Sequence, residues 1–392
     1  MTADGVGKSM DTSSGEVAGP DGPTGPDVAV GDPPAVEPTA DATSIWDDRY
    51  EKGEHVGSQA VIEGDPIDYT QHKFLYQHSI GKPMTGSLDG WSVDSIAKQF
   101  FNPPPARVLA IGSGLAFLEE YLVAQGYAQH VTAYEMSQVA VDKARERVAN
   151  KPYAGRLDLR CGDVLTENIP TGEYDAVFVL AAIHHFYEIE AMYALMHRVL
   201  KPGGLLWFDE YIGPDHHIYE PEVLAIMDEV NDCLATSYRW DVLSSQTRAM
   251  VPRPSLEWML QHDPSEGVHA SRILPLTYQW FDMVHRQDYG GAIMRPFFTG
   301  ILPNFDWADP KDQTVARLVI LIEQMLTRLG IVPSYHTAVV GRRRDQPLPP
   351  LTAAEEHRIN YADWPGLATK APPPSVPVPE KRAGLVSRLL GR

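Results

Sequence analysis

The stretch VLAIGSGLAFLEEYL (108–122) decides the fold of this chain. It begins as a short apolar strand, turns at Gly112, Ser113 and Gly114, and continues with the apolar spacing of a helix. Glycines in such a turn let a ligand approach the backbone, and the first turn of the helix presents N–H groups without intrahelical partners. The stretch therefore predicts a strand–turn–helix unit whose turn binds a ligand.

The alternation of strand and helix continues beyond this unit. Further strands are predicted at 130–135, 157–163, 174–181 and 205–212, with helices between them at 115–126, 139–150 and 189–200 and a Lys-Pro-Gly-Gly turn at 201–204. Strand character returns at 269–276 and 278–287, followed by a helix at 315–330 and a last strand at 334–341. Alternating elements joined by short loops predict a Rossmann-like, doubly wound α/β fold with a mostly parallel, seven-stranded sheet.

Composition divides the chain into six regions. The first 43 residues are rich in Gly, Pro, Asp, Ser and Thr, and they bury too little apolar surface to offset the entropy cost of ordering. In chain order we predict a disordered acidic tail (1–43), a helical and irregular lid region (44–105), the ligand-binding core (106–212), a helical substrate cap (213–265), the completion of the sheet (266–344), and a Pro-rich linker with a basic C-terminal tip (345–392).

Charge and composition limit the classes of function. The formal net charge of −19 argues against a nucleic-acid partner, because proteins that bind a phosphate backbone present a basic face. The N-terminus lacks the apolar core of a secretory signal, and no stretch reaches the roughly 18 apolar residues that span a bilayer. The only two cysteines are Cys161 and Cys233, too few for a disulfide framework. We therefore expect a cytoplasmic protein that acts on a small molecule.

Two later strand ends carry acidic residues that suit a nucleoside ligand. Glu135 ends the second strand, about 20 residues after the glycine turn, where a carboxylate can accept both ribose hydroxyl protons. Asp163 follows the third strand in Cys161–Val164, where it can accept from an adenine amino group while its neighbours flank the ring. Because parallel strands end at one edge of a sheet, these residues are expected to share one site.

Together these motifs resemble the class I S-adenosylmethionine-dependent methyltransferases, and HRVLKPGGLLWFDEYIGP (197–214) is similar to the helix–turn–strand signature of that family. Ala110 and Ala116 depart from the family pattern, which often has an acid and a third glycine there. The resemblance implies S-adenosylmethionine as cofactor, bound by Gly112, Ser113, Gly114, Glu135, Met136, Asp163, Val164 and Ala181. A nicotinamide dehydrogenase would use the same turn and Glu135, but it favours a small residue where Phe117 stands.

The catalytic candidates follow the fourth and fifth strands. His184 and His185 come just after the fourth strand, and histidine can act as a base near neutral pH. Asp209 and Glu210 end the fifth strand, where they could orient a hydroxyl, support the base or bind a divalent cation. We assign no metal ligands, and a divalent metal stays an open alternative.

The acceptor is indicated by a looser resemblance. Three stretches, EYIGPDHH (210–217), 263–276 and 287–294, are similar to a bacterial subgroup of methyltransferases associated with sugars and glycans. We therefore expect O-methylation of a sugar, glycan or related small molecule with a histidine base. Methylation of a nitrogen or of a lipid-linked acceptor, and a catalytically silent cofactor-binding partner, remain alternatives. The basic tip (381–392) has an apolar stripe that could dock weakly on a membrane or a partner. The sequence leaves the oligomeric state open.

Overall fold

The computed structural model of the chain describes residues 42–52 and 69–361. Its main sheet has the strand order β3-β2-β1-β4-β5-β9-β8. The strands are β1 (Arg107–Ile111), β2 (His130–Glu135), β3 (Leu157–Cys161), β4 (Tyr174–Leu180), β5 (Leu200–Tyr211), β8 (Phe281–Gly290) and β9 (His336–Arg343). The first five run parallel, whereas β9 is antiparallel to both β5 and β8. The predicted mostly parallel, seven-stranded, doubly wound fold is confirmed.

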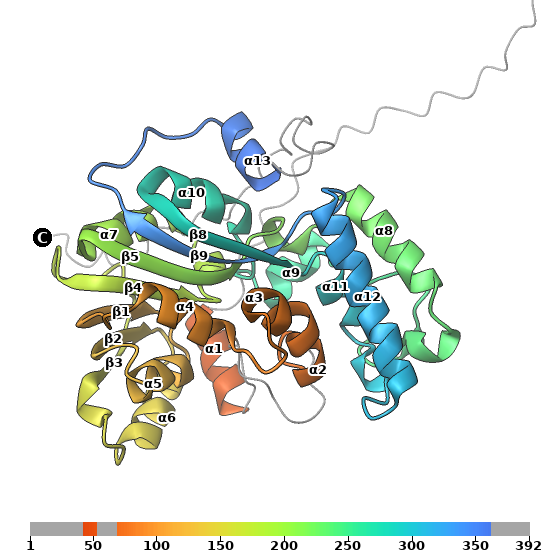
Figure 1. Cartoon of the computed structure of the whole chain (residues 1–392), viewed down its shortest axis with the longest axis horizontal. Helices are drawn as coiled ribbons and strands as arrows, with labels where there is room; N and C mark the ends of the chain where they lie inside the picture. Colours follow the sequence, from red (N-terminus) through yellow and green to blue (C-terminus); the bar gives the residue numbers. More distant parts are fainter. Residues whose placement is uncertain (1–41, 53–68, 362–392) are drawn as a thin grey trace, which may run out of the picture. The chain divides into compact units, whose positions relative to one another are not determined.

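Helices cover both faces of this sheet (Figure 1). Alternate residues of β1 point to opposite faces, as a strand requires. Val108 and Ala110 join a core formed with α4, α5 and α6, whereas Leu109 and Ile111 join a core formed with α7 and α10. The bounds of these helices are α4 (Ser92–Phe100), α5 (Phe117–Ala124), α6 (Gln138–Val148), α7 (Ile189–Val199) and α10 (Ile273–Trp280).

A third core packs against the sheet through Tyr211 of β5 and Ala338 of β9. It brings together segments from the predicted lid region, the predicted cap and the segment after β8. Its helices are α2 (Lys73–Tyr76), α3 (Lys82–Thr85), α8 (Pro221–Asp232), α11 (Met294–Phe298) and α12 (Pro310–Arg328). Between α8 and α11 lie a small hairpin, β6 (Trp240–Asp241) and β7 (Gln246–Thr247), and helix α9 (Leu256–His262). The cap segment 213–265 therefore shares its core with chain segments far away in the sequence.

Two local predictions differ from the structure. The strand predicted at 269–276 is wrong, because a short 3-10 turn and α10 occupy it and bury Ile273, Leu274 and Leu276. A short buried apolar run has no periodicity that separates helix from strand. The turn at 201–204 lies inside β5, where the pairing jumps from Tyr174–Leu200 to Ala176–Leu205. Gly203 has a φ of +74° there, so the glycine permits a bulge within one strand.

The chain ends fall largely outside the described residues. The predicted disordered tail up to residue 41 and the basic tip (381–392) cannot be compared with the structure. Within the predicted Pro-rich linker, the structure has a helix, α13 (Ala353–Tyr361), which contacts α10. In the part of the chain that is described, every helix is too short or too polar to cross a membrane.

The buried face of β1 gives a prediction about stability. Leu109 is fully buried, so Leu109→Ala should lower the free energy of unfolding by about 2–5 kcal/mol through lost transfer energy and a residual cavity. The same truncation at Leu318 of α12, which is 53% exposed, should change it by less than about 0.5 kcal/mol. Urea unfolding monitored by circular dichroism measures both, and equal losses would contradict this account of the sheet core.

Candidate active site at the carboxyl edge of the sheet

The turn after β1 has the geometry that its glycines predict. Gly112 and Gly114 have φ angles of +68° and +52°, a region that favours glycine. A Cβ on Gly112 would lie 2.5 Å from the Cβ of Ala182, so no other residue fits there without displacing the loop after β4. The N–H groups of Gly112 and Ser113 donate to the carbonyl oxygen of Tyr134 in β2. The turn is thereby held against the ends of both neighbouring strands.

Glu135 lies next to this turn at the end of β2. One carboxylate oxygen accepts from the N–H of Gly114 at 2.8 Å, and the other accepts from the N–H of Ser137 at 3.0 Å. Burial raises the pKa of Glu135, and these backbone hydrogen bonds oppose that rise. Met136, the next residue, keeps 38% of its surface exposed. Each carboxylate oxygen can accept a further hydrogen bond, so Glu135 can also hold ligand hydroxyls.

The remaining predicted cofactor residues follow β3 and β4. Asp163 accepts from the N–H of Leu165 at 3.0 Å, and Val164 is buried. Ala181 is exposed, has a φ of +52°, and donates its N–H to the carbonyl oxygen of Asp209. All eight predicted cofactor residues therefore follow β1, β2, β3 or β4, at the carboxyl edge of the sheet where ligands of open α/β folds bind.

Helix α1 (Ala42–Glu51) lies across this edge and contacts the turn after β1 and the start of α6. Its Tyr50 hydroxyl lies 2.7 Å from the position that a Cβ of Gly114 would occupy. Its Asp47 accepts hydrogen bonds from the hydroxyl of Ser137 and, at 3.5 Å, from the N–H of Val139. The same helix reaches His185, because the Trp46 ring meets the imidazole edge-on with centroids 4.9 Å apart. Helix α1 thus contacts the predicted cofactor residues and a predicted catalytic residue.

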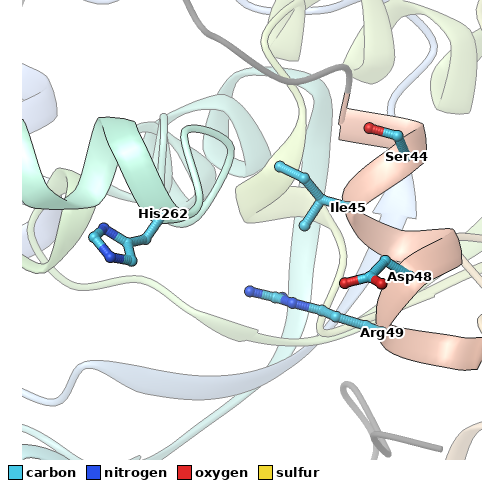
Figure 2. A pocket seen from close by; sticks show the side chains of 5 residues that line it. All are labelled: Ser44, Ile45, Asp48, Arg49 and His262. Atoms are coloured by element: carbon cyan, nitrogen blue, oxygen red, sulfur yellow. The ribbon is translucent and has the colours of Figure 1, made fainter. Parts of the chain in front are cut away.

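A hollow of about 470 Å³ separates α1 from α9 (Figure 2). It is lined by Ser44, Ile45, Asp48, Arg49 and His262. Arg49 reaches across it toward α9 and pairs with Asp263 at 3.1 Å. This ion pair connects α1 with the segment that precedes Ser265 and Glu266.

His184 is held by Glu210 from the neighbouring strand. The Glu210 side chain is fully buried, and one oxygen accepts from the N–H groups of Ala182 and Ile183 at 2.6 and 2.7 Å. Its other oxygen lies 2.5 Å from Nδ1 of His184. An ionised carboxylate only accepts, so Nδ1 carries the proton and Nε2 is the basic nitrogen. Burial would lower the pKa of His184, but the carboxylates of Glu210 and Glu266 outweigh burial and raise it.

Glu266 joins His184 to three further polar side chains. Nε2 of His217 lies 2.8 Å from one carboxylate oxygen, and Arg295 donates to the same oxygen at 3.3 Å. The second oxygen lies 3.9 Å from Nε2 of His184 and 3.7 Å from Nε2 of His185. Burial alone would raise the pKa of Glu266, but its hydrogen bond with His217 and the neighbouring histidines and arginine hold it well below its usual range. Glu266 is therefore ionised among these groups.

Two of the histidines stay neutral. Burial, with a smaller contribution from His184, lowers the pKa of His185 to about 3. Burial and the guanidinium of Arg295 lower the pKa of His217 to about 4. Of the three histidines beside Glu266, only His184, with its raised pKa, can exchange a proton near neutral pH.

Asp209 lies apart from the histidines. Its carboxylate accepts from the Tyr289 hydroxyl at 2.5 Å, and its backbone pairs with Ala338 of β9. Glu210 and Asp209 point to opposite faces because they are consecutive in a strand. Of the four predicted catalytic residues, the structure brings together His184, His185 and Glu210.

Several site residues did not emerge from the sequence reasoning. Glu266, Ser265 and Arg295 come from irregular segments or a short helix far along the chain from the histidines. One signal for Glu266 existed, because it lies within the stretch 263–276 that resembles sugar methyltransferases. Tyr50 and Trp46 both lie in α1, but no pattern in the chain connects this helix with the ligand-binding turn.

Comparisons with known proteins found a family model and several partial relatives. Residues 109–208 match the family model described as a methyltransferase domain. A sterol 24-C-methyltransferase of Neurospora crassa is 27% identical over 111 residues, which cover 28% of this chain and 29% of that protein. A demethylmenaquinone methyltransferase of Symbiobacterium thermophilum is 28% identical over 121 residues, 30% of this chain and 47% of that protein. A solved putative sarcosine dimethylglycine methyltransferase from Galdieria sulphuraria is 12% identical with a TM-score of 0.43, covering 77% of this chain and 99% of that one.

The matched segment coincides with the parallel part of the sheet. Residues 109–208, which match the methyltransferase domain, contain the end of β1, the turn after it, β2 to β4 and most of β5. The chain spans less than a third of the length of the Neurospora relative and about half of the Symbiobacterium relative. The activity and the acceptor of the whole protein are therefore taken up as proposals.

The site fits S-adenosylmethionine in charge as well as in backbone shape. That cofactor has a positive sulfonium and an ammonium group, and Glu135, Glu119 and Asp47 place carboxyl groups around the turn after β1. Oε2 of Glu119 is buried and has no hydrogen-bond partner among the described residues. Burial and the neighbouring Glu135 raise the pKa of Glu119 to about 7. A cationic ligand beside this carboxyl would give Oε2 of Glu119 a partner and would reduce the repulsion between Glu119 and Glu135.

Glu119 yields a prediction about pH. Because the pKa of Glu119 is raised in the folded protein, ionisation of this carboxyl destabilises the fold. The destabilisation is absent below the unfolded-state pKa of about 4.5 and complete above about pH 7. Without cofactor, Glu119→Gln should therefore raise the melting temperature at pH 8.5 and leave it nearly unchanged at pH 4.5. Differential scanning calorimetry measures both values.

The neighbouring Glu120 is the matched control. Burial would raise its pKa, but hydrogen bonds from Arg147 at 2.8 Å and Tyr153 at 2.7 Å lower it overall. A lowered pKa gives stability above the unfolded pKa, so Glu120→Gln should lower the melting temperature at pH 8.5. If both variants changed the melting temperature in the same direction at pH 8.5, the environments assigned to Glu119 and Glu120 would be wrong.

Proposed function

We propose that this protein transfers a methyl group from S-adenosylmethionine to a hydroxyl oxygen of a small polar molecule, with His184 as general base. The observation that supports this most is the pairing of His184 with Glu210. Nδ1 is held at 2.5 Å by a buried carboxylate, so Nε2 faces Glu266 as a proton acceptor. The loop that carries His184 packs against Gly112 of the cofactor turn.

The proposed reaction needs little from the protein beyond alignment and one proton transfer. When bound, S-adenosylmethionine supplies a methyl group on a sulfonium that leaves as a neutral thioether. Nε2 of His184 takes the hydroxyl proton of the acceptor as the acceptor oxygen bonds to the methyl carbon. The Glu210 carboxylate stabilises the resulting imidazolium, and it holds the ring in the tautomer that can act as a base.

The side chains around His184 favour a hydroxyl-rich acceptor such as a sugar or a related molecule. They include His185, His217, Glu266 and Arg295, which can hydrogen-bond to hydroxyl groups. Residues of two of the three stretches similar to sugar and glycan methyltransferases meet here: Glu210 contacts His184, and His217 contacts Glu266. These contacts support the acceptor class that the looser resemblance suggested.

Methylation of a ring carbon next to a phenolic oxygen is a second candidate. It would use the same base, because removal of the phenolic proton makes the neighbouring carbon nucleophilic. The edge-on contact of Trp46 with His185 gives the site an aromatic wall for a flat acceptor. The Symbiobacterium relative is named as a demethylmenaquinone methyltransferase, which is consistent with this second class.

Glu210→Gln tests the role of the His184–Glu210 pair. The amide oxygen can still accept from the N–H groups of Ala182 and Ile183, but the amide N–H₂ then faces Nδ1 of His184. The proton moves to Nε2, so the base is lost and kcat should fall roughly 100- to 10,000-fold, with the affinity for S-adenosylmethionine changed less than about twofold. Transfer of labelled methyl groups to a panel of sugars, polyols, quinols, lipids and amines measures turnover, and calorimetry measures binding.

Glu135→Ala is the complementary variant, which should weaken cofactor binding and leave the proposed base in place. It leaves His184 intact but removes an acceptor of ribose hydrogen bonds, each worth about 1.5–3 kcal/mol to a charged group, so cofactor affinity should fall at least tenfold. Unchanged kcat in Glu210→Gln would reject base catalysis by this pair. Cofactor binding without transfer to any acceptor would favour the silent-partner alternative, and the position of the label in the product separates oxygen, carbon and nitrogen methylation.

A further inference from the structure

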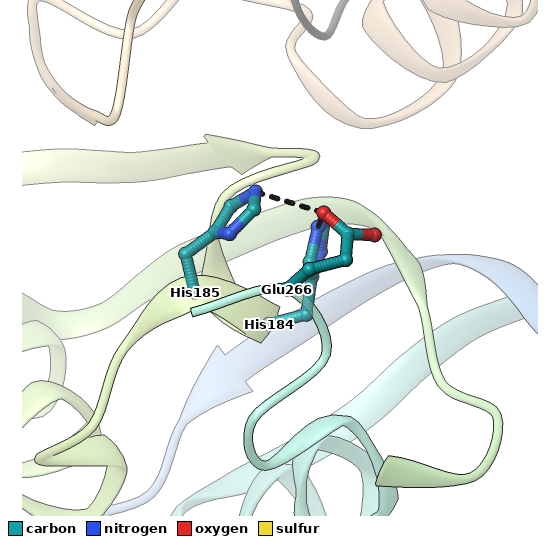
Figure 3. Close-up of side chains that lie close together, drawn as sticks. All are labelled: His184, His185 and Glu266. Carbon is teal, nitrogen blue, oxygen red and sulfur yellow. Dashed lines mark ion pairs between the residues drawn. The ribbon is translucent and has the colours of Figure 1, made fainter. Parts of the chain in front are cut away.

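Three potential ligand atoms face one another beside the proposed base. They are Nε2 of His184, Nε2 of His185 and Oε2 of Glu266, all within 4.8 Å of one another (Figure 3). The carboxylate oxygen lies 3.9 and 3.7 Å from the two nitrogens, which is too far for hydrogen bonds. In a tetrahedral site with bonds of about 2.0–2.2 Å, ligand atoms lie about 3.3–3.6 Å apart. The two nitrogen–oxygen distances exceed this range by a few tenths of an ångström at most, so small rotations of the side chains would bring the three atoms around one ion.

The outer nitrogen of each imidazole is already occupied. Nδ1 of His184 lies against Glu210 at 2.5 Å, and Nδ1 of His185 lies 3.2 Å from the hydroxyl oxygen of Ser265. Ser265 donates its own proton to Asp263 at 2.9 Å, so its oxygen accepts from His185. Both rings thus have Nδ1 protonated and the Nε2 lone pair toward Glu266. Metal-ligating histidines almost always have such a partner on the outer nitrogen, because it fixes the tautomer and raises the basicity of the ligand.

The charges also suit a cation. Metal ligands must offer a free lone pair, and the outer partners of both Nδ1 atoms leave the Nε2 lone pairs of His184 and His185 toward the Glu266 carboxylate. Arg295 opposes a cation, but it contacts the other oxygen of Glu266, and Glu210 supplies a second carboxylate. His185 and Glu266 each keep 17% of their side-chain surface exposed, so that an ion can reach them from solvent.

We propose that His184, His185 and Glu266 bind one divalent transition-metal ion of the zinc type. Two imidazoles and one carboxylate suit Zn²⁺, Co²⁺ or Fe²⁺, whereas Mg²⁺ and Ca²⁺ take mainly oxygen ligands. Three protein ligands leave a fourth position for water or an oxygen of an acceptor. The ion uses the nitrogen that accepts the proton in the proposed function, so binding of the ion and base catalysis exclude each other. The site itself does not rest on the proposed function, whereas its effect on turnover does.

The test uses Co²⁺ as a spectroscopic probe. Full-length protein freed of metal by a chelator is titrated with Co²⁺, and the visible absorption of the ion is recorded. We expect one ion per chain with the strong bands of four-coordinate Co²⁺. His185→Gln and Glu266→Gln should each weaken binding about 100-fold or more, and Ser265→Ala, which removes only the outer partner of His185, about tenfold. His130→Gln changes an exposed histidine at the start of β2 and should leave the titration unchanged.

A second measurement covers variants that fold poorly. Zn²⁺ should raise the melting temperature of the unmodified protein and of His130→Gln, because an ion that binds only the folded state stabilises it. The same stoichiometric Co²⁺ spectrum in His185→Gln and Glu266→Gln, or no binding by the unmodified protein at micromolar Co²⁺, would overturn the proposal.

Turnover separates this inference from the proposed function. Zn²⁺ should inhibit methyl transfer by the unmodified protein, and a chelator should restore it. Co²⁺ binding without methyl transfer to any hydroxyl would reject the proposed function alone. Methyl transfer by a protein that binds no Co²⁺ would reject the metal site alone.

Discussion

The buried carboxylate of Glu210 is the contact on which the rest of the active site depends. It comes from β5, yet it accepts two backbone N–H groups from the loop after β4 and fixes the imidazole of His184. A buried carboxylate is tolerated only when its oxygens are satisfied, and here three donors from a single loop satisfy them. The loop after β4 is therefore fixed by the neighbouring strand, and His184 with it.

The loop after β4 also fixes the position of the predicted cofactor turn relative to His184. Ala182, whose N–H is held by Glu210, leaves no room for a Cβ on Gly112. The turn after β1 can approach the loop after β4 only with a glycine at that position. The predicted cofactor turn and the loop that carries the proposed base are thus adjacent pieces of backbone that pack against each other.

The sequence predicted those parts of the structure that repeat a local pattern. The strands β1 to β5 were located by apolar runs between helices, and all eight cofactor residues lie at the expected sheet edge, because the carboxyl ends of parallel strands meet there. The strand predicted at 269–276 is a helix, since a short buried run has no distinguishing period. Glu266 and Arg295 could not be placed beside His184, because tertiary packing of irregular segments decides their positions. The proposed metal ligands include one of these unplaced residues.

Helix α1 connects the predicted cofactor side of the site with the proposed acceptor side. Asp47 and Tyr50 contact the cofactor side, whereas Trp46 and Arg49 contact His185 and Asp263 on the acceptor side. A rigid helix fastened at both sides cannot move away from one without breaking contacts at the other. In the proposed reaction, release of the spent cofactor and release of the acceptor therefore share a free-energy cost. A ligand that strengthens the contacts of α1 on one side strengthens binding on the other side by the same factor, as in the reciprocal coupling of two binding sites.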